Sequence, residues 1–173
     1  MKLEYRIIRR KLSYDYKYDS NLNTFSNNIK NNMRDILKLI DIDTGNDLFI
    51  CNQVQTVANH PKMKLSDTVK IGNFQVKHFV DKRAYINDVH GIINGTDINN
   101  QSIDNYSMQQ DEKRYIGRWL IHDTFDPKLQ RETSGYSGGC FIMKPDKLKQ
   151  LNNILILAGI KKNDIIDGIL EER

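Results

Sequence analysis

Residues 39–57 read LIDIDTGNDLFICNQVQTV and give the clearest indication of the fold. Apolar and polar side chains alternate over residues 39–43, as they do in a strand with one buried face. The TGND segment at residues 44–47 is typical of a tight turn, and a second extended run covers residues 48–57. The stretch therefore predicts a β-hairpin.

Further strands are expected on the C-terminal side of this hairpin. The two-residue period of residues 73–80 places four side chains on one face, namely Phe74, Val76, His78 and Val80. Residues 115–122 (YIGRWLIH) and 164–170 have the same extended character. Residues 81–110 are polar and have little periodicity, so we expect a functional loop or lid there.

Two helices are predicted from apolar residues at helical spacing. The first covers residues 20–40 and carries Phe25, Ile29, Met33, Ile36 and Ile40. The second covers residues 145–158 and carries Leu148, Leu151 and Leu155, with Gly159 as its stop. Because the strands and helices do not alternate regularly, they predict an α+β domain dominated by its sheet. Residues 1–37, a strand-like segment plus a helix, are expected to form an N-terminal appendage to a main domain of residues 38–173.

The composition excludes several classes of protein. The 173 residues are 39% hydrophobic and 28% charged, which is enough apolar material for a folded core. The net charge of +4 falls short of a dense basic stripe, so nucleic acid is not expected as a partner. The longest apolar run, residues 154–158, is too short to cross a bilayer, so no membrane span is expected. No signal peptide is visible, which predicts synthesis in the cytoplasm.

The residues that can carry chemistry gather in two short segments, which contain His122, Asp123 and Thr124, and Ser137, Gly138, Gly139 and Cys140. A cysteine nucleophile needs a base within hydrogen-bond reach and donors for the developing oxyanion. His122 ends a predicted strand and is the candidate base, while the two glycines let consecutive backbone N–H groups converge. The two segments predict a cysteine–histidine pair for acyl transfer.

A structural interpretation of the cysteines stands beside this one. Cys140 precedes the apolar residues 141–143, and cysteine in such a place is commonly a small core residue. Cys51 lies within a predicted strand and is expected in the core. Two cysteines cannot form a disulfide framework.

The other histidines are weighed in the same way. His78 on a strand face is expected to be structural, and His60, before a proline in a turn, is expected to be solvated. His90 lies in the polar 81–110 segment and is the rival to His122 as the base, because loops carry function. No spacing typical of metal ligands is present, so neither a metal nor another cofactor is expected.

The segment from His122 to Cys140 resembles the signature of the L,D-transpeptidase catalytic domain, the YkuD-like family. In that family a strand ending in Ile-His is followed, after a loop, by Ser/Thr-His-Gly-Cys. Here His122 and Cys140 are 18 residues apart, and the second segment reads Ser-Gly-Gly-Cys. Gly72 and Phe74 match the family's preceding T-P-x-G-x-F stretch. The resemblance covers about residues 38–170 and implies a YkuD-like mixed β-sandwich or barrel, with a helix after the nucleophile.

The resemblance implies action on peptidoglycan stem peptides. Cys140 would attack the carbonyl between the diamino acid and the terminal D-alanine, and His122 would move the proton. The other site residues that it implies are oxyanion donors at Gly138 and Gly139, a hydrogen bond near the thiol from Ser137, and substrate contacts from Tyr136, Asp123 and Thr124. Tyr136 or the 81–110 segment would cover the site.

The sequence departs from the family's pattern at two positions beside the nucleophile. Gly138 replaces a histidine, and Ile142 replaces an Arg or Asn. These departures favour hydrolysis, as in an L,D-carboxypeptidase, over crosslinking, and a phage or prophage wall-degrading protein released to the cell wall or periplasm. The alternative is a non-catalytic peptidoglycan-binding or phage structural module that retains the fold.

Overall fold

The computed structural model describes residues 1–15, 33–58, 68–81, 85–103, 119–126, 131–132, 137 and 139–173. Within these residues an eight-stranded sheet has the order β11-β8-β5-β4-β12-β1-β2-β3. Its strands are β1 (Leu3–Arg9), β2 (Asp35–Asp41), β3 (Asn46–Val54), β4 (Gly72–Asp81), β5 (Val89–Ile93), β8 (Leu120–Asp123), β11 (Phe141–Met143) and β12 (Ile165–Glu172). The other described elements are β6 (Gly95–Thr96) paired with β7 (Ser102–Ile103), β9 (Phe125–Asp126) paired with β10 (Arg131–Glu132), the 3-10 helix η1 (Lys11–Asp15) and the helix α2 (Pro145–Leu157).

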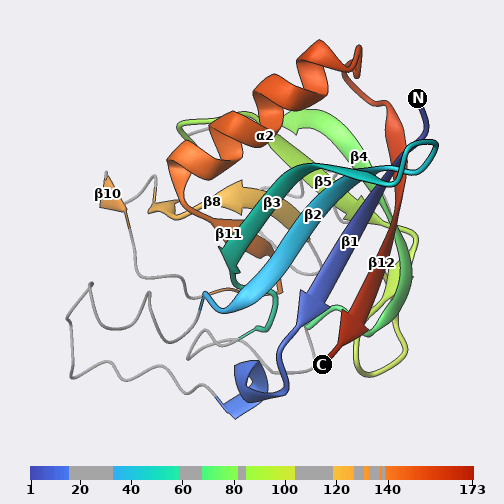
Figure 1. The fold of residues 1–173 in the computed structure, drawn as a ribbon. Helices are drawn as coiled ribbons and strands as arrows, with labels where there is room; N and C mark the ends of the chain where they lie inside the picture. Colours follow the sequence, from blue (N-terminus) through green and yellow to red (C-terminus); the bar gives the residue numbers. More distant parts are fainter. Residues whose placement is uncertain are drawn as a thin grey trace.

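The two edges of the large sheet meet, so that the sheet is nearly closed into a barrel. Just beyond β3, Gln55 and Ile142 exchange two backbone hydrogen bonds of 2.9 Å, which join the β3 edge to the β11 edge. Closure satisfies backbone groups that an open edge would leave unpaired. Figure 1 shows α2 lying across one end of the curved sheet, with β1 and β12 side by side.

The core lies inside the curved sheet and beneath α2. Alternate strand residues face inward because side chains on a strand alternate between its two faces. The inward residues include Tyr5, Ile7, Leu37, Leu39, Phe49, Phe74, Val76, Ile121, Phe141 and Met143, and α2 adds Leu148, Leu151 and Leu155. Gly168 on β12 faces Phe74, and a Cβ atom at this position would overlap the phenyl ring. Glycine therefore lets the Phe74 ring lie directly across the strand.

A buried arginine, Arg9, lies at the C-terminal end of β1 and forms a hydrogen-bond network there. Arg9 is fully buried, and its guanidinium donates to the Thr56 hydroxyl at 2.8 Å and to the carbonyl oxygens of Thr56 and Val69. The Thr56 hydroxyl in turn donates to the carboxylate of Asp35, which is also fully buried. The Asp35 carboxylate also accepts hydrogen bonds from Ser13 and from the Arg10 backbone. This network ties β1, β2 and the end of β3 together.

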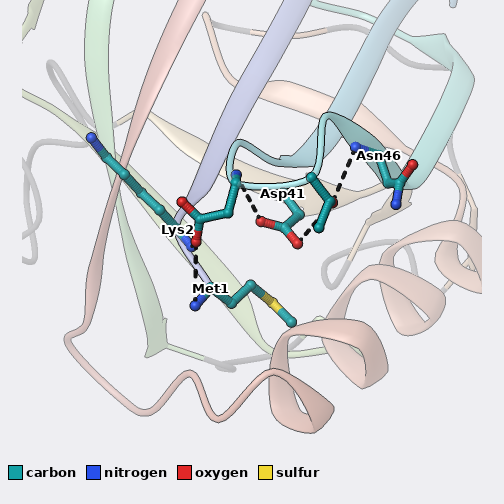
Figure 2. Close-up of polar contacts among 6 residues, drawn as sticks. Met1, Lys2, Asp41 and Asn46 are labelled. Carbon is teal, nitrogen blue, oxygen red and sulfur yellow. Dashed lines mark hydrogen bonds and ion pairs between the residues drawn. The ribbon is translucent and has the colours of Figure 1, made fainter.

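The turn between β2 and β3 holds the start of the chain. Figure 2 shows the Asp41 carboxylate accepting bonds from the Asp43 backbone N–H and the Thr44 hydroxyl, which shape the turn. The Asp43 carboxylate accepts the Lys2 backbone N–H at 2.9 Å and lies 3.5 Å from the amino group of Met1. The two aspartates thus fix the N-terminus beside the hairpin.

The structure confirms an α+β fold dominated by its sheet. The predicted hairpin is present as β2 and β3, and the strands predicted at residues 73–80 and 164–170 are β4 and β12. The predicted C-terminal helix is α2, with Pro145 in its first turn and Gly159 at a φ of 82° just after its end. Among the described residues, the thirteen-residue α2 is the one α-helix. No helix in this part of the chain is long and apolar enough to cross a membrane.

Three sequence predictions differ from the structure. Residues 35–41 form β2 instead of the end of a helix, while residues 16–32 of that predicted helix lie outside the described residues. β1 lies between β12 and β2 inside the sheet, so the first residues are part of the main domain and not an appendage. The segment predicted as a polar loop contains β5, whose five residues are all buried.

Candidate functional site

The site is built on two neighbouring strands, β8 and β11, which run parallel. Ile142 on β11 is in register with His122 on β8, so both side chains lie on the same side of the sheet. Their strand neighbours Ile121 and Phe141 face the core on the other side. The candidate base therefore lies on the outer face of the barrel.

Cys140 directly precedes β11 and lies against β8. The backbone N–H of Leu120 donates to the Cys140 sulfur at 3.3 Å. Leu120 is two residues before His122, so the thiol and the imidazole are carried by adjacent strands, two positions apart along them. The hydrogen bond from Leu120 places the Cys140 sulfur against the start of β8.

The two cysteines have different environments. Cys140 is partly exposed, whereas Cys51 is 1% exposed within the core. The Cys51 thiol donates to the Gln53 carbonyl oxygen at 3.6 Å, and burial raises the pKa of this thiol. The prediction that Cys51 is a core residue is confirmed. Of the two cysteines, Cys140 is the one that is not buried.

The protonation of His122 follows from one short hydrogen bond. Its Nδ1 atom lies 2.6 Å from the backbone carbonyl oxygen of Asp123. A carbonyl oxygen only accepts hydrogen bonds, so Nδ1 carries the proton. In the neutral ring Nε2 then carries the lone pair. This is the tautomer that a general base with an oriented ring requires.

The turn before Cys140 is held by Ser137. The Ser137 hydroxyl accepts the Gly139 backbone N–H at 2.9 Å and donates to the Cys140 carbonyl oxygen at 2.7 Å. Gly139 has a φ of 120°, a conformation that side-chain-bearing residues rarely adopt. Ser137 therefore shapes the backbone of the turn. The Gly139 N–H, predicted as an oxyanion donor, binds Ser137 in this structure, and Gly138 lies outside the described residues.

The predicted substrate contacts are placed differently from the expectation. Asp123 is fully buried and Thr124 is 3% exposed. The Asp123 carboxylate accepts the backbone N–H of Phe125 at 3.0 Å and the side-chain amide of Asn87 at 3.1 Å. A buried carboxylate with these bonds holds the local chain and does not face a substrate. Tyr136 lies outside the described residues.

Sequence reasoning missed Tyr85. The rings of Tyr85 and His122 have centroids 4.6 Å apart and are inclined by 33°. Tyr85 belongs to the 81–110 segment, which was expected to cover the site, but no local motif singles it out. A tyrosine in a polar segment has no sequence signal that relates it to a histidine on another strand.

The rival base His90 is part of the interior. It lies on β5, is fully buried, and its Nδ1 accepts the Phe79 backbone N–H at 3.0 Å. Its Nε2 lies 2.6 Å from the amide oxygen of Asn152 on α2, to which it donates. Burial lowers the pKa of His90 to about 3, so this ring stays neutral. Both ring nitrogens of His90 have hydrogen-bond partners in the interior, so His90 is not placed to act as the base for Cys140.

His78 is also a structural histidine, as predicted. Its Nδ1 lies 2.8 Å from the Asp164 carbonyl oxygen, and its Nε2 accepts the Tyr5 hydroxyl at 2.9 Å. Burial lowers the pKa of His78 to about 4. The predicted solvation of His60 concerns a residue outside the described part. Among the residues that the structure describes, no group of three or more His, Cys, Asp or Glu side chains could hold a metal ion.

Sequence comparison connects the chain to one bacterial protein. It is similar to a protein of Treponema pallidum (strain Nichols) that is named as an uncharacterized protein. The two are 34% identical over 177 residues, which cover 96% of this chain and 78% of that protein. No protein-family model and no solved structure matches the chain.

Proposed function

Because the chain belongs to the family of this Treponema pallidum protein, whose name describes no activity, we propose a function from the site: Cys140 and His122 form a nucleophile–base pair for acyl transfer. The observation that carries the proposal is the Nδ1 hydrogen bond of His122 on β8, beside the strand whose leading residue is Cys140. It leaves the lone pair of the ring on Nε2, which is where a base needs it. The backbone N–H that Leu120 donates to the sulfur places Cys140 against the strand that carries His122.

The proposed substrate is a peptidoglycan stem peptide, and the proposed fold relation is a divergent YkuD-like domain. Support for this relation comes from the order of the elements. A hairpin, a strand with Gly72 and Phe74, the histidine strand β8, the cysteine strand β11 and a helix follow one another as the family's signature implies. The near closure of the sheet agrees with a mixed barrel.

The reaction proceeds in two balanced steps. The Cys140 sulfur attacks the carbonyl carbon before the terminal D-alanine, while His122 Nε2 takes the thiol proton. The tetrahedral intermediate collapses to a thioester, and the leaving D-alanine amine receives that proton from His122. A water molecule then attacks the thioester while His122 accepts its proton. The carbon–sulfur bond breaks, His122 returns that proton to the Cys140 sulfur, and the shortened peptide leaves with a new terminal carboxyl group. An amine in place of water would give transfer.

A second function is favoured by the turn at Ser137. The Gly139 N–H is bound by the Ser137 hydroxyl, and Ile142 is 2% exposed where the family has a polar residue. A site with fewer oxyanion donors and no polar group at this position suits a non-catalytic module that binds peptidoglycan. This protein would bind stem peptides and leave them unchanged.

Incubation with disaccharide-tetrapeptides and mass analysis distinguishes the two functions. The enzyme interpretation predicts loss of D-alanine with the natural protein and with Cys51→Ser, and none with Cys140→Ser. Cys51→Ser is the matched control because a serine hydroxyl can also donate to the Gln53 carbonyl. Binding of the peptides without turnover would support the module and contradict the enzyme. Added glycine as an amine acceptor separates hydrolysis from transfer.

A further inference from the structure

Asp123 binds the candidate base through its backbone carbonyl and binds Asn87 through its carboxylate. Its backbone carbonyl oxygen accepts the Nδ1 proton of His122 at 2.6 Å. Its carboxylate accepts the backbone N–H of Asn87 at 3.3 Å and the side-chain amide of Asn87 at 3.1 Å. Asn87 is two residues after Tyr85, whose ring lies on the imidazole. The imidazole therefore has two neighbours, the Asp123 carbonyl oxygen and the Tyr85 ring. Asp123 is the last residue of β8 and also binds Asn87, two residues after Tyr85.

Asn87 also connects this arrangement to the start of α2. Its side-chain amide donates to the Pro145 carbonyl oxygen at 2.9 Å as well as to Asp123. The Asn87 amide thus joins the end of β8 to the first turn of the helix that follows the cysteine strand. These bonds are partly buried, with Asp123 itself fully buried.

We propose that Asn87 and Asp123 form a latch that holds Tyr85 against His122 and so sets the position of the imidazole relative to Cys140. The inference rests on the proposed function, because it assigns Tyr85 and Asn87 as positioning residues for the same base. Two features are needed to fix an imidazole: a hydrogen bond that fixes its tautomer and a surface that limits its rotation. Asp123 supplies the first directly and the second through Asn87 and Tyr85.

The latch explains why a buried aspartate follows the base histidine. A carboxylate in the interior is costly unless it is hydrogen-bonded. The Asp123 carboxylate accepts hydrogen bonds from Asn87, which precedes β8 in the sequence, and from Phe125, which follows it. Its cost in desolvation is thus offset by bonds that organise the surroundings of His122.

The test is the pH profile of Cys140 alkylation by iodoacetamide, read residue by residue by peptide mass analysis. Tyr85→Ala removes the ring and Asn87→Ala removes the two side-chain bonds of the latch, whereas the control variant Asn153→Ala alters an exposed residue of α2. We expect the two latch variants to slow alkylation near pH 6 by roughly ten- to a hundred-fold, because small displacements of a catalytic group have effects of this size. The Asn153→Ala control should stay within about twofold of the natural protein, since it removes no latch contact.

The buried Cys51 serves as the internal measure of folding. In every variant it should stay unreactive until denaturant is added, because it is 1% exposed. The latch is overturned if His122→Asn slows the alkylation of Cys140 while Tyr85→Ala and Asn87→Ala leave the natural profile intact. If His122→Asn itself has no effect on the profile, the proposed function fails as well, so the two failures are distinguishable.

Discussion

The Nδ1 atom of His122 and the carbonyl oxygen of Asp123 are 2.6 Å apart, which fixes the imidazole in the tautomer that carries its proton on Nδ1. The same argument gives His78 a proton on Nδ1, which lies by the Asp164 carbonyl oxygen. His90 is the opposite case, because its Nδ1 accepts a backbone N–H and its Nε2 faces an amide oxygen. The tautomer of each ring therefore follows from its hydrogen-bond partners, and His90 differs from the other two.

Nitrogen NMR of the imidazole rings checks this assignment. At pH 7.5 the long-range nitrogen–proton correlations of His122 and His78 should show Nδ1 protonated, and those of His90 should show Nε2 protonated. The His122→Asn variant identifies the first set of signals. Nε2 protonation of neutral His122 would remove the argument that it is oriented as a base.

Acid should destabilise the protein through its two buried histidines. Burial lowers the pKa of His78 to about 4 and that of His90 to about 3, against an ordinary value of 6.5. Below the ordinary histidine pKa of 6.5 the unfolded chain binds protons that the folded chain does not. The free energy of unfolding therefore decreases as the pH is lowered. The stabilising effect is complete above about pH 6.5 and is lost as the pH falls towards the folded values.

The expected slope approaches about 1.4 kcal/mol per pH unit for each histidine once the unfolded ring is protonated. Urea unfolding measured from pH 7 to pH 5 avoids most of the carboxylate titration. The His90→Gln variant should lose about half of the slope, since one of the two histidines then no longer titrates. A free energy of unfolding that is constant over this range would contradict the neutral, buried state of both rings.

Replacing Arg9 tests the buried network at the end of β1. Arg9→Met leaves the buried carbonyl oxygens of Thr56 and Val69 without their guanidinium donor, and should cost about 3 to 5 kcal/mol in the free energy of unfolding. Arg6 is the matched control, because it lies on the opposite face of the same strand and its side chain is 46% exposed. Arg6→Met should change stability by less than about 1 kcal/mol. Equal effects in urea unfolding would show that burial of Arg9 has no structural importance.

The elements that the sequence predicts correctly have a clear local period. The β2–β3 hairpin has alternating residues around a TGND turn, and β4 places Phe74, Val76 and His78 on one face. α2 has its apolar positions at helical spacing, with Pro145 and Gly159 marking its ends. In each case one face is buried and the other is solvated, so the period of the apolar residues predicts which face is buried.

The elements that sequence reasoning misses have buried polar residues or two buried faces. The first part of β2 is predicted as a helix because the spacing of Met33, Ile36 and Ile40 matches a helical period, and its first residue, Asp35, is a buried polar residue. β5 is buried on both faces and contains His90, and such a strand has no alternation to detect.

The site follows the same division. His122 and Cys140 are proposed from the sequence because the segments that carry them resemble a family signature with a similar spacing. Tyr85 and Asn87 reach His122 and Asp123 across 36 to 37 residues of sequence, through a bend with no motif of its own. The burial of Asp123 depends on packing that the sequence does not display, so its structural role could be found only in three dimensions.

The central claim is that Cys140 is a nucleophile which His122 activates, and its most direct test is acylation by an activated ester. The protein is incubated with p-nitrophenyl acetate at pH 7, and the acetylated residues are identified by peptide mass analysis. We expect a thioester on Cys140 and none on Cys51, with formation slowed by about a hundredfold or more in His122→Asn. A Cys140 that remains unmodified, or that is acetylated as fast without His122, would contradict the account.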